Sequence, residues 1–198
     1  FFASEINLVT PFLLLPEIPF VISDVLPSLA IIGPIAAIVA VIFMKLIIFL
    51  GTLPPKFKIK NWQSPVIAGL FCGLFGMFFD EVLGLGTNTV MMVITSNQDT
   101  SYLLALLVGK LLLSCICLGF GFFGGTFSPA LFLGAIVGAL VFQLPLTSMN
   151  IDFLSILAVS GMAAVSSSVI GAPITAIILV LELTGSYEYA IAATFPIV

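Results

Sequence analysis

The residues whose types and order suggest chemistry lie in one short segment, GGTFSP at 124–129. Pro129 suits the first turn of a helix, where its missing N–H would have no partner, and Ser128 suits the N-cap. The first amides of such a helix lack intrahelical acceptors, and the helix dipole adds partial positive charge there. Because two glycines permit a sharp turn, the amides of Thr126 and Phe127 can point inward. The pattern predicts an anion-binding site formed by Gly125, Thr126, Phe127, Ser128 and Pro129, with Phe127 as its apolar wall.

In a soluble protein the same six residues would most often be no more than a capped helix start. A membrane changes that balance, since an unpaired amide in lipid costs several kcal/mol and must face protein, water or an anion. A site built from amides also suits an anion that has to leave again, because a buried Lys or Arg would hold it more tightly. The absence of Arg from the sequence agrees with this interpretation.

The composition indicates a protein that resides in lipid. Of 198 residues, 61% are apolar and 7% charged, against roughly 25% charged in soluble domains. A mean hydropathy of +1.35 requires an apolar solvent, so we expect an integral, multi-pass membrane protein. With no Arg and a net charge of −4, nucleic-acid binding is excluded.

The sequence contains no His, which is the usual general base and the usual zinc ligand. Serine–histidine hydrolases, rhomboid-type proteases and most metalloenzymes are therefore excluded. An intramembrane aspartyl protease needs a G-x-G-D motif, whereas Gly86 is followed here by Thr87. We expect no catalytic residues, no metal and no cofactor, and we interpret Cys72, Cys115 and Cys117 as buried free thiols.

Residues 28–51 form the clearest membrane span, with Lys45 as its one charge and Pro34 as a kink. The preceding residues, 1–27, are interrupted by prolines and are interpreted as an interfacial or external connection. Three of the five lysines follow the span within residues 56–60, beside Trp62, which predicts that this loop faces the cytoplasm.

The middle of the chain predicts a short apolar helix and a bend. Residues 65–79 are apolar, and glycines at 69, 73 and 76 suggest a face for close helix packing. Asp80 and Glu81 end this helix and are expected at the membrane interface. Gly84 and Gly86 suggest a tight bend before a short helix, and residues 97–101 are interpreted as an exposed loop.

No residue between Lys110 and Asp152 is charged, a stretch about twice as long as one span. The chain must break within it, and the glycine-rich residues 119–129 mark that break. A helix over 129–142 follows, whose Ala130, Gly134 and Gly138 place a small residue at every fourth position for close packing. The uncharged residues 153–181 predict two helices broken at 171–173. Short, broken helices of this kind are typical of transport proteins.

Three further positions allow both a structural and a functional interpretation. Lys110 could attract anions, although a lysine near a helix end more often extends to the membrane interface. Glu182 could relay protons, but capping or packing explains it at least as well so close to a glycine. The serines at 166–168 could hydrate a pore, and helix packing explains them equally well.

Three segments in order resemble the CLC family of chloride channels and chloride/proton exchangers. The central segment is the family's G-x-F-x-P motif, here Gly125-Thr126-Phe127-Ser128-Pro129. The second is GAPITAIILVLELTGSYE at 171–188, and the third is GLFCGLFGMFFDEVLGLGTN at 69–88. Together they cover most of the chain from about residue 28 onward.

The resemblance implies an all-α, polytopic transmembrane bundle of short, tilted and broken helices, corresponding to the second half of the CLC inverted-repeat architecture. It implies that the Thr126 and Phe127 amides help to coordinate a central chloride. It also implies a homodimer in the inner or plasma membrane, with residues 28–51 and those from about 172 onward contributing to the interface.

Several elements of the family have no match in this sequence, including the motif with a chloride-contacting Ser, the motif with the gating Glu, the inner proton-relay Glu and the late chloride-contacting Tyr. None of the acids present is assigned those roles. We therefore expect residues 1–198 to be part of a single CLC-type transmembrane domain, as a fragment that lacks the N-terminal half and the last helix of that domain. Passive channel and proton-coupled exchanger both remain open, with voltage gating undecided, and a transporter of fluoride, nitrate or an organic anion is the alternative.

Overall fold

The computed structural model describes residues 22–60, 62–77, 79–144 and 152–197, and all regular elements in these ranges are helical. This confirms the predicted all-α class. In chain order the elements are α2 (Ile22–Gly51), α3 (Leu53–Lys56), α4 (Gln63–Gly76), the 3₁₀ turn η1 (Asp80–Val82), α5 (Thr87–Thr95), α6 (Thr100–Gly119), α7 (Phe127–Phe142), α8 (Asp152–Ile170), α9 (Pro173–Thr184) and α10 (Tyr187–Ile197).

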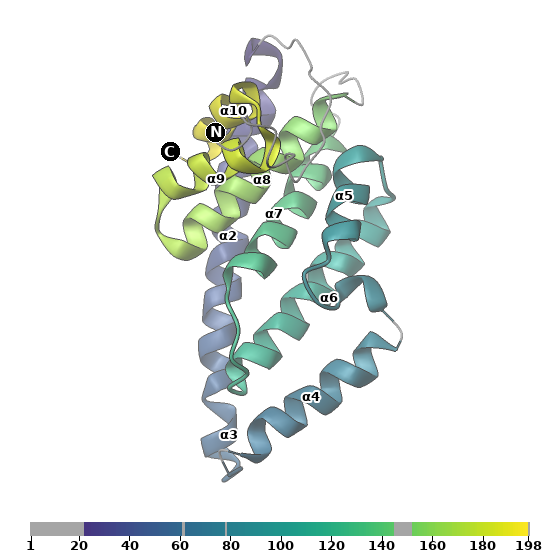
Figure 1. Ribbon diagram of the computed structural model, residues 1–198, viewed down its shortest axis with the longest axis vertical. Helices are drawn as coiled ribbons and strands as arrows, with labels where there is room; N and C mark the ends of the chain where they lie inside the picture. The colour runs from purple at the N-terminus through teal and green to yellow at the C-terminus, as the bar shows by residue number, and fades with distance from the viewer. Residues whose placement is uncertain (1–21, 61, 78, 145–151, 198) are drawn as a thin grey trace, which may run out of the picture.

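Within these ranges three helices, α2, α6 and α8, are long and apolar enough to cross a membrane. The longest, α2, extends along most of the molecule, with α9 and α10 at one end and α3 and α4 at the other (Figure 1). The helix begins at Ile22, so the prediction that residues up to Pro27 form a connection is wrong for residues 22–27. The earlier part of that prediction, residues 1–21, lies outside the described residues. Both Pro27 and Pro34 lie inside α2.

The core of the molecule is the contact between α7 and α8, where glycines allow the two backbones to touch. A Cβ atom added to Gly138 would collide with the carbonyl oxygen of Leu157. One added to Gly134 would collide with the carbonyl oxygen of Gly161. Since no side chain fits at either position, the predicted small-residue stripe on α7 is confirmed as a packing surface. This contact places α7 directly against α8 beyond its first turn.

The glycines of α4 behave differently from those of α7. A Cβ atom added to Gly73 would meet no atom within 4 Å, while Gly69 and Gly76 face the side chains of Phe122 and Leu83. The predicted close helix-packing face on this segment is therefore wrong. Instead α4 lies at the edge of the helical bundle, where it contacts α6 and η1 (Figure 1).

The predicted bend at Gly84 and Gly86 and the predicted break at residues 171–173 are both present. Gly84 and Gly86 have φ values of +58° and +66°, which glycine adopts without steric cost, and they form the bend between η1 and α5. Gly171, with φ +73°, separates α8 from α9 at the predicted break. These turns allow short helices to begin and end within the apolar part of the fold.

Candidate anion-binding site

The predicted anion site lies at the beginning of α7, where the chain leaves a glycine-rich segment and becomes helical. The helix begins at Phe127, and Thr126 occupies the N-cap with φ −77° and ψ −13°. The prediction that Ser128 is the N-cap is wrong, because Ser128 is the second helical residue. The first four amides of a helix have no intrahelical acceptor, so Pro129 fits at the third position as well as at the first. The helix can therefore begin two residues earlier than predicted.

The glycine-rich segment before α7 is held at its beginning by α6 and α4. The amide of Phe122 donates to the carbonyl oxygen of Cys117 over 3.0 Å. The hydroxyl of Ser64 on α4 donates to the carbonyl oxygen of Phe120 over 2.7 Å. Beyond these contacts residues 121–125 are exposed, with Gly121 at φ +91°. The chain thus approaches Thr126 from an exposed turn, and the amide end of α7 is open.

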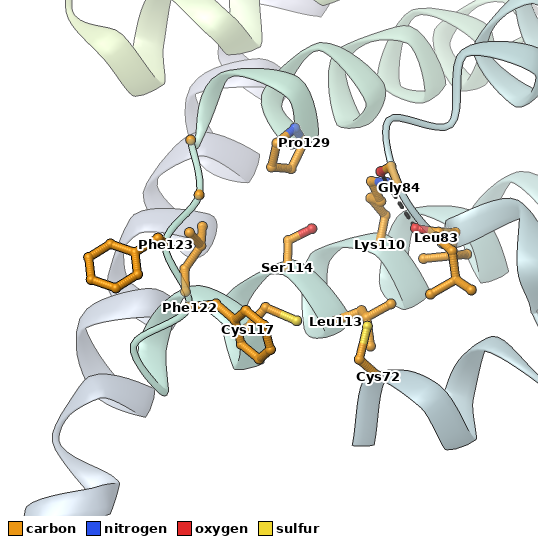
Figure 2. A pocket seen from close by; sticks show the side chains of 14 residues that line it. Cys72, Leu83, Gly84, Lys110, Leu113, Ser114, Cys117, Phe122, Phe123 and Pro129 are labelled. Atoms are coloured by element: carbon orange, nitrogen blue, oxygen red, sulfur yellow. Dashed lines mark hydrogen bonds between the residues drawn. The ribbon is translucent and has the colours of Figure 1, made fainter. Parts of the chain in front are cut away.

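A cavity of about 230 Å³ lies beside this helix start, between α4, η1, α6 and the glycine-rich segment. Pro129 and Ser114 both face it in Figure 2, from α7 and α6 respectively. Its lining consists of Cys72, Val82, Leu83, Gly84, Lys110, Leu113, Ser114, Cys117, Leu118, Phe122, Phe123, Gly124, Gly125 and Pro129. Among these described lining residues Lys110 alone is charged, so the one ionic group in the cavity wall is a cation.

Lys110 occupies the middle of α6 and is only 3% exposed. Its ammonium nitrogen donates to the carbonyl oxygens of Val82, over 2.9 Å, and Gly84, over 2.7 Å. It also lies 4.7 Å from the ring centre of Phe132 on α7. The expectation that Lys110 extends to the membrane interface is therefore wrong. Carbonyl groups freed by the η1–α5 bend provide hydrogen-bond acceptors inside the fold, and these make burial of the ammonium possible.

Only some of the candidate functional residues that the sequence indicated lie together at the cavity beside α7. Gly125, Pro129 and Lys110 line one cavity, with Thr126, Phe127 and Ser128 half-buried beside it. Glu182 is exposed on α9 and is not among the lining residues. The hydroxyl of Ser166 donates to Ala163 of its own helix and is fully buried, which favours packing over pore hydration.

Sequence reasoning missed the contribution of α4 and of the second half of α6 to the cavity wall. Ser114, Cys72 and Cys117 line the cavity, although nothing in their spacing indicated it. All three cysteines are free, as predicted, but only Cys115 is buried. Cys72 and Cys117 are half-buried and open toward the cavity. No local signal could have found them, because α4 and α6 meet here through tertiary contacts alone.

A comparison with known protein families decides the assignment. The family described as voltage gated chloride channel matches residues 6–198. The chain belongs to this family, the CLC family. The resemblance seen in the three sequence segments is confirmed, and with it the helical membrane architecture of a multi-pass protein.

Curated members of the CLC family similar to this chain are named as exchangers. The H(+)/Cl(−) exchange transporter ClcA of Klebsiella pneumoniae (strain 342) is 33% identical over 136 residues, 66% of this chain and 28% of the relative. The proteins of the same name from Citrobacter koseri and Vibrio cholerae (strain M66-2) are 30% and 29% identical, each over 80% of this chain and 35% of the relative. The chain thus spans about a third of the length of the curated relatives it matches.

Proposed function

We propose that this chain forms part of the anion pathway of a chloride transporter that exchanges chloride for protons. The amides of Thr126 and Phe127 hold the ion at the beginning of α7, and Gly125, Ser128 and Pro129 shape that beginning. Chloride is the transported ligand, and neither a cofactor nor covalent chemistry is needed. The names of the relatives support exchange in preference to a passive channel.

The observation that carries this proposal is the open amide end of α7 beside a cavity that Lys110 lines. The helix start is preceded by an exposed glycine-rich segment, and the close contact with α8 holds the rest of α7 in place. Lys110 raises the electrostatic potential at the cavity wall while its donors remain engaged with Val82 and Gly84. An anion is attracted by the charge and contacts neutral amides, which allows release.

The relatives' names also support chloride over the other anions considered, namely fluoride, nitrate and organic anions. Competition separates them. In liposomes containing the complete parent protein, excess chloride should suppress uptake of any other anion that uses the pathway. If excess chloride leaves uptake of a second anion unchanged, that anion is the substrate and the chloride proposal is wrong.

The amide site is tested by replacing one N–H without changing the side chain. Semisynthesis can substitute Phe127 with its α-hydroxy acid, which turns the amide into an ester and removes the donor. A hydrogen bond to a charged group contributes about 1.5–3 kcal/mol, so chloride affinity should fall roughly 10- to 100-fold. Isothermal titration of the purified parent protein with chloride measures the change.

The matched control is the same ester at Phe142, the last residue of α7. That substitution also removes one amide donor from the same helix, but at the end opposite the proposed site. Chloride affinity should remain unchanged. If the two esters lower the affinity equally, the effect is a general weakening of α7 and the amide site is not where chloride binds.

Three features of the whole transporter belong to the same proposal. We place it in the inner or plasma membrane, as a non-enzymatic transporter in contact with lipid. We also propose a homodimer in which each subunit has its own pore. Exposed apolar side chains on α2, α9 and α10 supply surface for the predicted interface, including Ile38, Ile174 and Ile191. Voltage gating stays a prediction of the family resemblance, and these residues do not by themselves require it.

A further inference from the structure

The segment that joins α3 to α4 is basic and aromatic, and the proposed transport step does not use it. Lys56, Lys58 and Lys60, three of the five lysines in the sequence, are all exposed there. Phe57 and Trp62 beside them are 69% and 68% exposed. We call these five residues the basic turn. Because large exposed aromatic rings are unfavourable in water, the combination indicates a partner that offers both negative charge and apolar surface.

The basic turn is held in one conformation by the hydrogen bonds that end α3. The amide of Ile59 donates to the carbonyl oxygen of Pro54 over 2.9 Å, and the amide of Lys58 donates to that of Pro55 over 3.1 Å. This pair of bonds goes with a φ of +54° at Lys58, in the left-handed region that glycine usually occupies after a helix. Among the described residues Lys58 alone combines a side chain with a positive φ. A lysine at a position where glycine would cost less indicates that its ammonium group has a use there.

No acidic residue lies on the parts of the chain that adjoin the basic turn. The sequence contains no Asp or Glu between Asp24, in the first turn of α2, and Asp80, which follows the far end of α4. These two helices of 30 and 14 residues span about 45 Å and 21 Å. The end of α6 also lies here, with Gly119 against Leu50, and residues 119–125 contain no acid either. Within the described ranges, the charged side chains at this end of the molecule are therefore all lysines.

The position of the basic turn relative to the membrane span decides which anion it meets. The apolar span that contains most of α2 runs from Val25 to Lys56, so the basic turn begins where the span ends. Figure 1 shows α3 and the beginning of α4 at one end of the molecule, with α9 and α10 toward the other. Residues just beyond a span lie at the level of the lipid headgroups, where lysines are attracted to anionic lipids and aromatic rings are enriched.

We propose that the basic turn binds the headgroups of anionic phospholipids in the adjoining leaflet. The ammonium groups of Lys56, Lys58 and Lys60 pair with phosphate oxygens, while Phe57 and Trp62 enter the region between headgroups and acyl chains. A phosphate ion free in water offers the same charge but no apolar surface for the two rings, so the exposed rings favour a lipid. This inference does not depend on which anion the protein transports.

The experiment titrates the complete parent protein, in a neutral detergent, into trace amounts of phosphatidylglycerol labelled on its tail, and fluorescence anisotropy reports binding. Phosphatidylcholine with the same labelled tail is the reference, because its headgroup has no net charge. Phosphatidylglycerol should bind at least roughly tenfold more tightly, and added salt should reduce that preference. Equal affinity for the two lipids would overturn the proposal.

Substitution of all three lysines assigns the preference to the basic turn. Each lysine near an anionic surface contributes roughly fivefold to binding, so Lys56→Gln, Lys58→Gln and Lys60→Gln combined should lower the affinity for phosphatidylglycerol at least roughly tenfold. The affinity for phosphatidylcholine should stay unchanged. The matched control replaces the same three lysines with Arg, keeps the charge and should keep the preference. If the Gln variant binds phosphatidylglycerol as tightly as the original protein, the lipid binds elsewhere and the proposal is wrong.

Lys58→Gly separates binding from folding. Glycine adopts a φ of +54° without steric cost, so the thermal midpoint of this variant should be unchanged or higher. Its affinity for phosphatidylglycerol should nevertheless fall roughly fivefold, through the loss of one charge. Unchanged affinity would contradict the role given to Lys58.

Competition distinguishes the lipid headgroup from a free phosphate ion. Inorganic phosphate should displace labelled phosphatidylglycerol no better than sodium gluconate at the same ionic strength. Displacement by phosphate alone would identify a soluble anion as the ligand of the basic turn and overturn the assignment to lipid.

Discussion

Lys110 is the residue at which three elements of the fold meet. From α6 its ammonium group reaches the η1–α5 bend, through Val82 and Gly84, and the ring of Phe132 on α7. The positive charge is therefore held in position by carbonyl oxygens rather than by a carboxylate. That arrangement keeps the charge available to the cavity while satisfying two of its three donors.

Replacing Lys110 with Met should destabilise the protein, because the Val82 carbonyl loses its donor in a buried position. An unsatisfied buried acceptor costs about 1–3 kcal/mol, which predicts a lower thermal midpoint for the parent protein in detergent. Lys45→Met is the matched control, since Lys45 is exposed on α2. A midpoint unchanged by Lys110→Met would show that the hydrogen bonds of Lys110 contribute nothing to stability.

The side chain of Phe127 has a different role from its amide. Phe127→Ala keeps the N–H, so chloride affinity should stay within roughly twofold. The smaller side chain alters the width of the pathway, and the transport rate should change as a result.

Pro129→Ala should instead lower the free energy of unfolding by about 0.4–1 kcal/mol, because the unfolded chain gains freedom and the helix start is less well defined. Binding titrations and thermal unfolding of the two variants distinguish these effects. Complete loss of folded protein in both would identify Phe127 as a simple packing residue.

At the scale of elements, the contact between α7 and α8 fixes the direction of the proposed site. Gly138→Ala places a Cβ atom where the Leu157 carbonyl already lies, so the helices must separate. We expect the free energy of unfolding to fall by about 1–3 kcal/mol, as it does when other protein cores are overpacked. Thermal unfolding of the detergent-solubilised parent protein measures it.

Gly73→Ala is the control for that substitution, since it makes the same change in a helix where nothing lies within 4 Å. Alanine is favoured over glycine inside helices by about 1 kcal/mol, so this variant should be as stable as the original or more so. If both variants lose equal stability, then the close approach of α7 and α8 is not what makes Gly138 necessary.

The sequence predicted those features of the fold that the positions of glycine and other small residues determine locally. The break at Gly171, the bend at Gly84 and the stripe on α7 all follow from local backbone preferences, and each is present. What α4 packs against could not be predicted, since its glycines have a spacing similar to those of α7 but meet side chains or open space. Spacing shows that a close approach is allowed, and only the tertiary arrangement shows whether a partner helix is there.

The same limit applies to the candidate site. The helix start was predicted from Pro129 and the glycines before it, but the position of Thr126 at the N-cap was not, since a proline fits any of the first helical positions. The burial of Lys110 was missed because its acceptors are backbone carbonyls 26 and 28 residues away in the chain. No side-chain pattern indicates a carbonyl group that a bend leaves unpaired.

At the scale of the whole molecule, many large apolar side chains are exposed. Much of the surface is therefore suited to contact with lipid or with another protein chain. Ile38 and Ile48 on α2, and Ile174 on α9, are each more than half exposed. Exposed apolar side chains of this number are unfavourable in water and are suited to a bilayer or to a subunit interface. The proposed homodimer would use α9 and α10 together with the exposed face of α2.

Dimerisation is tested by a polar substitution in that surface. Ile174→Gln on α9 should weaken subunit association and leave the monomer folded, because the side chain is 72% exposed and contributes little to the core. Light scattering in detergent measures the oligomeric state. Ile38→Gln, on the exposed face of α2, shows whether the predicted contribution of residues 28–51 holds as well. A dimer unaffected by both substitutions would contradict the proposed interface.

The measurement that tests the central claim most directly is chloride efflux from liposomes containing the complete parent protein, with external pH recorded at the same time. We predict that chloride moving down its gradient drives protons in the opposite direction. Chloride efflux without proton movement would contradict exchange and identify a passive channel. No chloride efflux would contradict the proposed function itself.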